Sequence, residues 1–203
     1  MNKETYAKYN NHWVTSDIHF NHESIRKYCP ESRGHLQSSD EMNEVIISNW
    51  NAVVNPTDHT FIIGDVAMGL IEKAPALIQR LNGAKTLIRG NHDRSLMKNP
   101  SNRELFISTH DYLCFSVKKV GVVMCHFPMA HWDGEGRGSC MLHGHLHSAK
   151  DKVHLFPSRR IIDVGLDGYD LCPRHLETTI ELLTQIPLPS TDHHGDPVDS
   201  KSQ

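Results

Sequence analysis

Histidine, aspartate and asparagine side chains cluster in five short motifs within residues 17–147. The motifs are Asp17-Ile18-His19, Gly64-Asp65, Gly90-Asn91-His92-Asp93, His126 and Gly144-His145-Leu146-His147. Carboxylate oxygens, an amide oxygen and imidazole nitrogens together suit Mn, Fe, Ni or Zn. The side chains able to act as ligands are Asp17, His19, Asp65, Asn91, His126, His145 and His147. This number is too large for one tetrahedral ion and suits two ions that share a bridging carboxylate.

Each motif follows a segment that reads as a short strand. We expect these strands at residues 12–17, 61–63, 85–88, 120–125 and 140–143. Taken singly, a Gly-Asp turn or an Asp-x-His triplet is common in loops, and Gly-Asn-His-Asp also fits a turn that begins a helix. The repetition carries the argument, because sites in open α/β sheets gather at the carboxyl ends of strands. Strand alternation also places His145 and His147 on the same side.

The remaining elements predict a layered α/β fold. A short helix from Asn21 to Cys29 is expected to stop at Pro30, and Ser38 with Glu41 forms a capping-box signature before a helix that reaches Val53. Further segments are predicted as a helix over 70–82, strands over 112–117 and 160–164, and a helix over 174–185. Residues 1–186 are predicted to form a single domain, and the polar, Pro/Gly/Ser-rich residues 187–203 a disordered tail.

Composition excludes several classes of protein. The 203 residues carry 21 Lys+Arg, 24 Asp+Glu and 16 His, and the formal net charge of -3 argues against a strongly basic nucleic-acid module. No apolar run is long enough to span a membrane, and the first residues lack the apolar core of a signal peptide. The five cysteines form no Cys-x-x-Cys pair, so we expect reduced thiols in a cytoplasmic protein.

The order of the motifs resembles the calcineurin-like metallophosphoesterase superfamily. The same five blocks occur in that order, and the segments Thr15-Ser16-Asp17-Ile18-His19-Phe20 and Asp163-Val164-Gly165-Leu166-Asp167 are similar to a small bacterial and phage subgroup. The resemblance covers about residues 1–185. It implies an α/β fold of the four-layer α/β/β/α sandwich type, with a dimetal site between the loops.

The resemblance also implies a role for each motif residue. One ion would be held by Asp17, His19 and His147, a second by Asn91, His126 and His145, and Asp65 would bridge the two. His92 would be the catalytic histidine that faces the phosphate, with Asp93 orienting its ring. The expected reaction is phosphoester hydrolysis, phosphodiester or phosphomonoester, by in-line attack of a hydroxide that bridges the metals, with His92 assisting at the leaving group.

Several points stay open at this stage. His22, Arg26 and His131 are candidate substrate contacts, although a plain surface helix explains His22 and Arg26 equally well. The substrate is expected to be a small phosphorylated molecule or a nucleotide, and manganese is the first choice for the two divalent ions, with Fe, Ni or Zn as alternatives. A nuclease is an alternative that the net charge disfavours. A catalytically silent binding module is a further alternative, disfavoured because every ligand and His92 are present.

Overall fold

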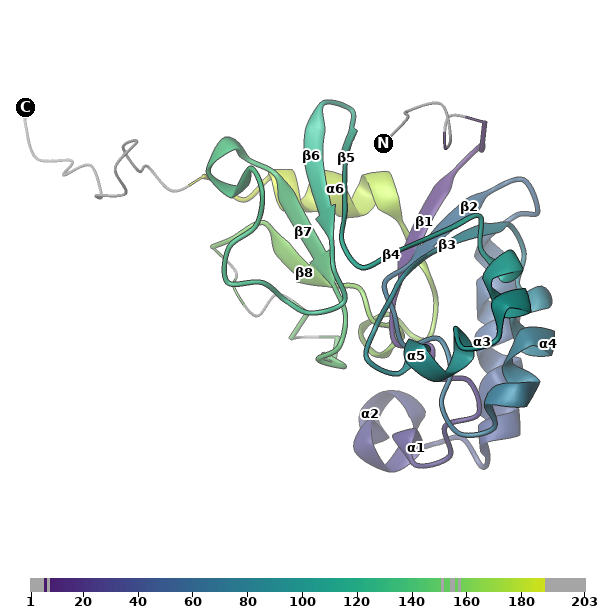
Figure 1. Ribbon diagram of the computed structural model, residues 1–203. Helices are drawn as coiled ribbons and strands as arrows, with labels where there is room; N and C mark the ends of the chain where they lie inside the picture. The colour runs from purple at the N-terminus through teal and green to yellow at the C-terminus, as the bar shows by residue number, and fades with distance from the viewer. Residues whose placement is uncertain (1–5, 7, 151, 154–155, 157, 189–203) are drawn as a thin grey trace, which may run out of the picture.

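Two β-sheets face each other across an apolar interior in the computed structural model of the chain (Figure 1). The structure describes residues 6, 8–150, 152–153, 156 and 158–188. The first sheet has the order β4-β3-β2-β1-β9, in which β9 is antiparallel to β1 and the other neighbours are parallel. Its strands are β1 (His12–Thr15), β2 (His59–Ile62), β3 (Ala84–Ile88), β4 (Ser108–His110) and β9 (Arg174–His175).

The second sheet has four strands in the order β5-β6-β7-β8. They are β5 (Leu113–Val117), β6 (Val120–Met124), β7 (Cys140–His143) and β8 (Ile161–Asp163). β5 and β6 form an antiparallel hairpin, whereas β6, β7 and β8 run parallel. One apolar cluster joins the two sheets. From the first sheet and the residue after β2 it contains Phe61 and Ile63, and from the second sheet Met124, Leu142 and Ile162.

Helices cover the outer face of the first sheet (Figure 1). They are α3 (Ser39–Val53), the 3-10 turn η2 (Ile71–Lys73) and α4 (Ala74–Gln79). Trp50 of α3 is fully buried in this layer. On the outer face of the second sheet, Trp132 covers Val123, Met141 and Ile161, just before the 3-10 turn η4 (Glu135–Arg137). The helix α6 (Leu176–Thr184) packs against β1, β9 and β7. The predicted α/β sandwich is therefore confirmed.

The strands that precede the motifs lie close to their predicted positions. The capping residue is also found as predicted, since Ser38 accepts a hydrogen bond from the Glu41 N–H at 3.1 Å at the start of α3. The helix predicted from Asn21 to Cys29 does end before Pro30, but it is shorter, α1 (Ile25–Tyr28), and Pro30 itself opens α2 (Pro30–Arg33). The fixed φ of proline and its missing N–H suit the first turn of a helix, so the residue starts an element here.

Several short elements escape the sequence patterns. They are the 3-10 segments η3 (Pro100–Leu105) and η5 (Leu166–Gly168) and the strands β4 and β9, whereas α5 (Asp93–Leu96) begins where the Gly-Asn-His-Asp motif allowed a helix to start. The predicted helix over 70–82 is split between η2 and α4, and the last helix is preceded by β9. These elements have two to six residues, which is too short for a hydrophobic period to show. Most of the predicted tail, residues 189–203, lies outside the described residues.

Two features of the described chain bear on its environment. None of its helices has both the length and the apolar character needed to cross a membrane. All five cysteines are free thiols.

Candidate metal centre

The loops that follow the strands bend sharply at the predicted ligands. Left-handed backbone occurs at Asp17 (φ 56°), His19 (φ 54°), Asp65 (φ 55°), His145 (φ 72°) and His147 (φ 49°). Non-glycine residues with such angles are uncommon and cost about 1–3 kcal/mol each, and they cluster at functional sites. The backbone thus turns these side chains back over the ends of the strands.

Glycines beside the ligands allow this close approach. A Cβ atom on Gly144 would lie 2.5 Å from Asp17 Oδ2, and one on Gly90 would collide with the Asp65 carboxylate. The loops pack directly on the carboxylates, so no side chain fits at either position. The glycines of these two motifs therefore have a steric basis, since glycine alone lacks a Cβ atom.

The first group of candidate ligands combines Asp17, His19 and His147. Their ligand atoms all lie within 4.8 Å of one another. Asp17 Oδ1 is 3.7 Å from His147 Nε2 and 3.9 Å from His19 Nε2. Asp17 comes after β1 and His147 after β7, so the two sheets together build this group.

The second group gathers around Asp65, the residue expected to bridge two ions. Asp65, His126 and His145 bring their ligand atoms within 4.8 Å of one another. Asp65 Oδ2 lies 3.4 Å from His126 Nε2 and 3.7 Å from His19 Nε2, so it faces both groups. Asn91 Oδ1 is 3.0 Å from His126 Nε2 and belongs to the same group.

The residues fit divalent ions. Asp17 Oδ1 and both ring nitrogens of His19 are buried without a hydrogen-bond partner, and such an orphaned group costs about 1–3 kcal/mol. Ligand bonds of about 2.1 Å place neighbouring ligand atoms about 3.0–3.5 Å apart, close to the spacings around Asp65. A cation between these atoms would satisfy them, and the mixed oxygen and nitrogen set is the one that first-row divalent metals accept.

Two histidines are held in the tautomer that metal binding requires. His126 Nδ1 is 2.8 Å from the Ile63 carbonyl oxygen, and His147 Nδ1 is 2.8 Å from Asp167 Oδ2. In each case Nδ1–H donates, so the neutral ring carries its lone pair on Nε2, the atom that faces the candidate metal positions. Both rings therefore arrive with orientation and tautomer already fixed.

Asp167 and Arg33 form a buried support that the sequence interpretation missed. Arg33 is fully buried and donates to the Asp167 carboxylate from Nε at 2.7 Å and from Nη2 at 3.0 Å. The same guanidinium donates to the carbonyl oxygens of Asp17, at 2.7 Å, and Ile18, at 3.0 Å. Arg33 thereby ties the first motif loop to the carboxylate that orients His147. No periodicity or motif marks an arginine in a four-residue helix, so only the structure reveals it.

Burial and charge separate the pKa values of the two carboxylates. Burial raises the pKa of Asp17 to about 7. Burial acts in the same direction on Asp65, but its hydrogen bonds with His126 and with the His92 N–H hold the pKa of Asp65 at about 2. Burial lowers the pKa of His19 to about 2, so this ring is neutral. The buried Asp17 carboxylate therefore lacks enough positive charge nearby, and a divalent ion would supply that charge.

His92 stands at the mouth of the site. Its side chain is 36% exposed, and its Nε2 lies 3.9 Å from Asp65 Oδ2. The centre of its ring is 5.5 Å from that of His19. The ring is thus open to solvent and next to the bridging carboxylate, where a substrate can reach it.

Asp93 makes different contacts from those expected. Its Oδ2 accepts from the N–H groups of Asp65 at 2.9 Å and Gly90 at 2.7 Å, and its Oδ1 accepts from the Val66 N–H at 2.9 Å. The predicted bond to the His92 ring is not among its contacts, because these three backbone donors engage both oxygens. Asp93 clamps the loops after β2 and β3 together, and so positions Asp65 rather than His92.

His22 is brought into the site. Its ring lies 5.4 Å from that of His19, and burial together with the charge of His92 lowers its pKa. A neutral, half-buried imidazole at this place can donate to or accept from a bound phosphate. The assignment of His22 as a substrate contact stays a prediction.

Arg26 and His131 are placed elsewhere. Arg26 donates to the Leu36 carbonyl oxygen at 2.6 Å and pairs with Glu23, so its guanidinium has local partners. The His131 side chain is 90% exposed, bonds to Glu135 at 3.0 Å, and lines a cavity beside Trp132 rather than the ligand groups. Both residues follow motifs closely in sequence, but the intervening turns direct them away.

The chain belongs to the calcineurin-like phosphoesterase family, whose sequence profile matches residues 12–201. It is 29% identical over 175 residues to an uncharacterized protein of Methanocaldococcus jannaschii, covering 84% of this chain and 90% of the relative. It is also 29% identical over 189 residues to the Gene 66 protein of Mycobacterium phage D29, covering 80% and 92%. A protein of unknown function from Aquifex aeolicus shares the fold, with a TM-score of 0.68 at 22% identity over 85% of this chain and 98% of that one.

Proposed function

We propose that this chain hydrolyses phosphoester bonds in a small phosphorylated molecule or a nucleotide, using two divalent ions, manganese first among them. One observation carries the proposal. Asp65 Oδ2 has the imidazole nitrogens of three histidines around it, with His126 at 3.4 Å, His19 at 3.7 Å and His92 at 3.9 Å. Both ligand groups and the exposed histidine therefore converge on one carboxylate oxygen.

The two ions, when bound, would supply Lewis-acid charge for the phosphoryl oxygens and for the attacking water. The chain itself contributes a fixed set of ligands. Bonds at Nδ1 orient His126 and His147 so that their Nε2 atoms face the candidate metal positions, and Asp93 holds the Asp65 loop by three backbone contacts. Such a preformed site needs little rearrangement when substrate binds, which is the condition for electrostatic catalysis.

In this proposal His92 is the general acid that protonates the leaving group. Its ring is partly exposed and lies beside Asp65, so a phosphoester bound between the ligand groups would place an ester oxygen within its reach. As the imidazolium, the ring can donate a hydrogen bond to the phosphate and then pass its proton to the departing oxygen, which leaves a neutral imidazole. Histidine is the side chain that most often transfers protons in this way.

A substrate screen tests the proposal. Metal-free protein, prepared with EDTA, is compared with manganese-loaded protein on p-nitrophenyl monoesters and diesters, cyclic nucleotides and dinucleoside polyphosphates. We expect turnover of at least one class only after loading, and the same turnover in the control His131→Ala, whose ring lies outside the ligand groups. A folded, metal-loaded protein that is inert toward the whole panel would support a binding module instead.

A further inference from the structure

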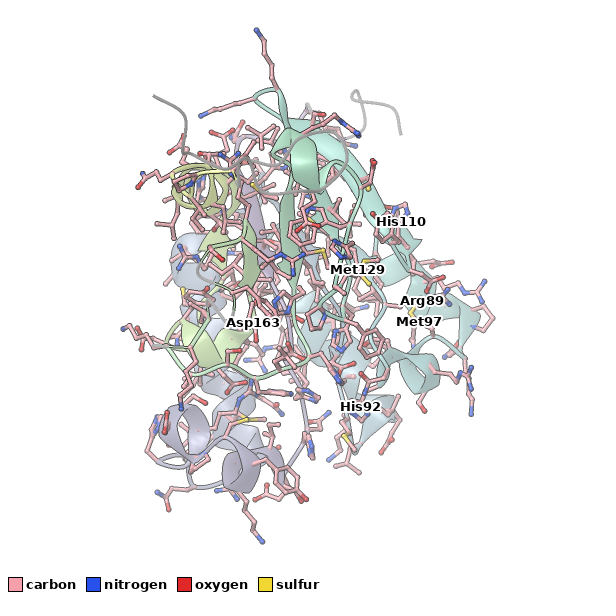
Figure 2. The ribbon with its side chains drawn as sticks, turned by 90° about the vertical axis from the view of Figure 1, so that its left-hand side faces the viewer. Arg89, His92, Met97, His110, Met129 and Asp163 are labelled. Carbon is pink, nitrogen blue, oxygen red and sulfur yellow. The ribbon has the colours of Figure 1, made fainter. Side chains whose placement is uncertain are left out.

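A large groove opens beside the second ligand group. Its volume is about 1030 Å³, and it shares Gly90 and Asn91 with the motif that follows β3. Its other lining residues are Arg89, Arg94, Met97, Lys98, Arg103, Thr109, Asp111, Cys125 and Phe127. Figure 2 shows Arg89 and Met97 next to each other on one side of the molecule, with His92 below them. The groove therefore begins where the candidate metal centre ends.

The groove carries an excess of positive charge. Arg94, Lys98 and Arg103 are exposed, and they have no ion-pair partner among the described residues. The fourth cation, Arg89, is neutralised by a two-point contact with Asp111 at 2.8 and 2.5 Å, and Asp111 is the one carboxylate among the described lining residues. A chain with a net charge of -3 thus concentrates three unpaired cations next to its reactive site.

An aromatic side chain lies at the junction of the groove and the metal centre. Phe127 is 45% exposed and follows the ligand His126 directly. Its ring packs edge-on against His145, with the centres 4.7 Å apart. An exposed aromatic face between a metal site and a row of cations offers a stacking surface for a nucleobase.

We propose that this groove binds a short single-stranded oligonucleotide on one side of the phosphoester that lies at the metals. The inference rests on the proposed function and extends its substrate from a nucleotide to a short oligonucleotide. Arg94 lies in α5, Arg103 in η3, and Lys98 between these two elements. The groove volume of about 1030 Å³ accommodates more than one nucleotide. Phe127 requires an unpaired base, which excludes a duplex at this point. The overall negative charge limits the contact to a few phosphates.

Direct binding tests the groove without relying on turnover. The affinity of a fluorescein-labelled dT hexanucleotide is measured by anisotropy in EDTA for the full chain and for the triple variant Arg94→Gln/Lys98→Gln/Arg103→Gln. We expect Kd to rise at least about tenfold and the slope of log K against log salt to flatten by about 2, since each single-strand phosphate contact contributes about 0.7. The single variant Phe127→Leu should raise Kd by about fivefold or more.

A second triple variant provides a matched control. Lys73→Gln/Lys119→Gln/Arg137→Gln removes the same number of exposed charges outside the groove, so its Kd should stay within about twofold of wild type. Equal losses in the two triple variants, or no loss in the groove variant, would overturn the proposal. The proposal would also be overturned if tripolyphosphate displaced the labelled strand as well as unlabelled hexanucleotide does at equal phosphate concentration. The groove would then recognise clustered charge alone.

Hydrolysis of bis-p-nitrophenyl phosphate separates this inference from the proposed function. The groove variant should retain wild-type turnover of this small diester, because none of its three changed residues belongs to the ligand groups. Absence of turnover of the whole substrate panel in every metal-loaded protein would contradict the proposed function, while the anisotropy result would still decide whether the groove binds a strand.

Discussion

Histidines lie at both ends of the first sheet, and the two ends differ in chemistry. β1 begins at His12 and β2 at His59, and these two rings are 5.6 Å apart at the amino ends of the strands. The same strands lead at their carboxyl ends into Asp17, His19 and Asp65. Two neighbouring strands thus carry imidazoles at one end and a mixed carboxylate–imidazole cluster at the other.

The amino end uses histidine as a packing residue. His59 is fully buried, lies against Phe61 with ring centres 4.5 Å apart, and bonds through Nε2 to the Thr86 hydroxyl at 2.9 Å. Burial lowers its pKa to about 3, so the ring is neutral. At the carboxyl end, by contrast, left-handed turns bring carboxylates within 4 Å of the imidazoles. Carboxylates that face imidazoles on left-handed turns, rather than the number of histidines, distinguish the candidate metal centre.

Replacing one carboxylate by its amide at each end of the sheet should show the largest difference between the two ends. Asp65→Asn removes the charge shared by both ligand groups, and we expect bound manganese to be lost and turnover to fall by roughly a thousandfold. Asp58→Asn changes the buried carboxylate at the amino end, which bonds Asn11 and Trp13. It should leave the metal content unchanged in elemental analysis after dialysis. Full metal occupancy in Asp65→Asn would contradict the assignment.

Removal of the exposed histidine should abolish chemistry without removing metal. His92→Ala leaves both ligand groups intact, so metal content and the melting temperature should match wild type. kcat should fall by about a hundredfold or more, the usual effect of losing a general acid. Steady-state kinetics on the best substrate of the panel measures this, and near-normal turnover would show that His92 has no catalytic role.

Weakening Asp167, the carboxylate that orients His147, should have a smaller effect on metal binding. Asp167→Asn keeps the size of the side chain but weakens its bond to His147 Nδ1 and its ion pair with Arg33. We expect manganese to bind about 10- to 100-fold more weakly in competition with a chelating dye. Asp170→Asn, at an exposed position that pairs with Lys150, is the matched control. Identical manganese affinities in the two variants would show that Asp167 does not support metal binding.

The amino-end histidine should affect acid stability instead. The pKa of His59 is about 3 in the folded chain and about 6.5 when unfolded, so the unfolded state binds more protons between these values. Stability is therefore lost as the pH falls below about 6.5, by about 2 kcal/mol at pH 5. In urea unfolding with EDTA, His59→Phe should lose less stability than wild type between pH 8 and pH 5. Equal losses in both proteins would contradict this account of His59.

The sequence predicts the candidate ligands because each one lies at or just after the end of a strand, whereas their division between two ions comes from the family resemblance. Each motif follows a strand, and neighbouring parallel strands must end at the same edge of a sheet, so the motifs of one sheet meet once its strands pair. The packing of the two sheets then brings both sets of motifs together. The same reasoning anticipates the α/β sandwich and the Ser38 cap. Strand periodicity and cap chemistry involve residues only a few positions apart, and tertiary contacts do not alter them here.

The contacts that escape prediction depend on long-range packing. Arg33 and Asp167 are 134 positions apart, and no short motif announces their pairing. Asp93 was expected to orient its sequence neighbour His92, yet its carboxylate faces the loop after β2 because α5 begins there. His131 follows the His126 motif by five residues, but the chain carries it toward Trp132. The direction of a loop side chain is set by what packs around it.

The position of bound metal tests the central claim most directly. Anomalous diffraction from manganese-loaded crystals should show two peaks about 3.5–4 Å apart, with Asp65 between them. One peak should contact Asp17, His19 and His147, and the other Asn91, His126 and His145. A single ion, or an ion held instead by the nearby group of Cys29, His147 and Asp167, would contradict the account.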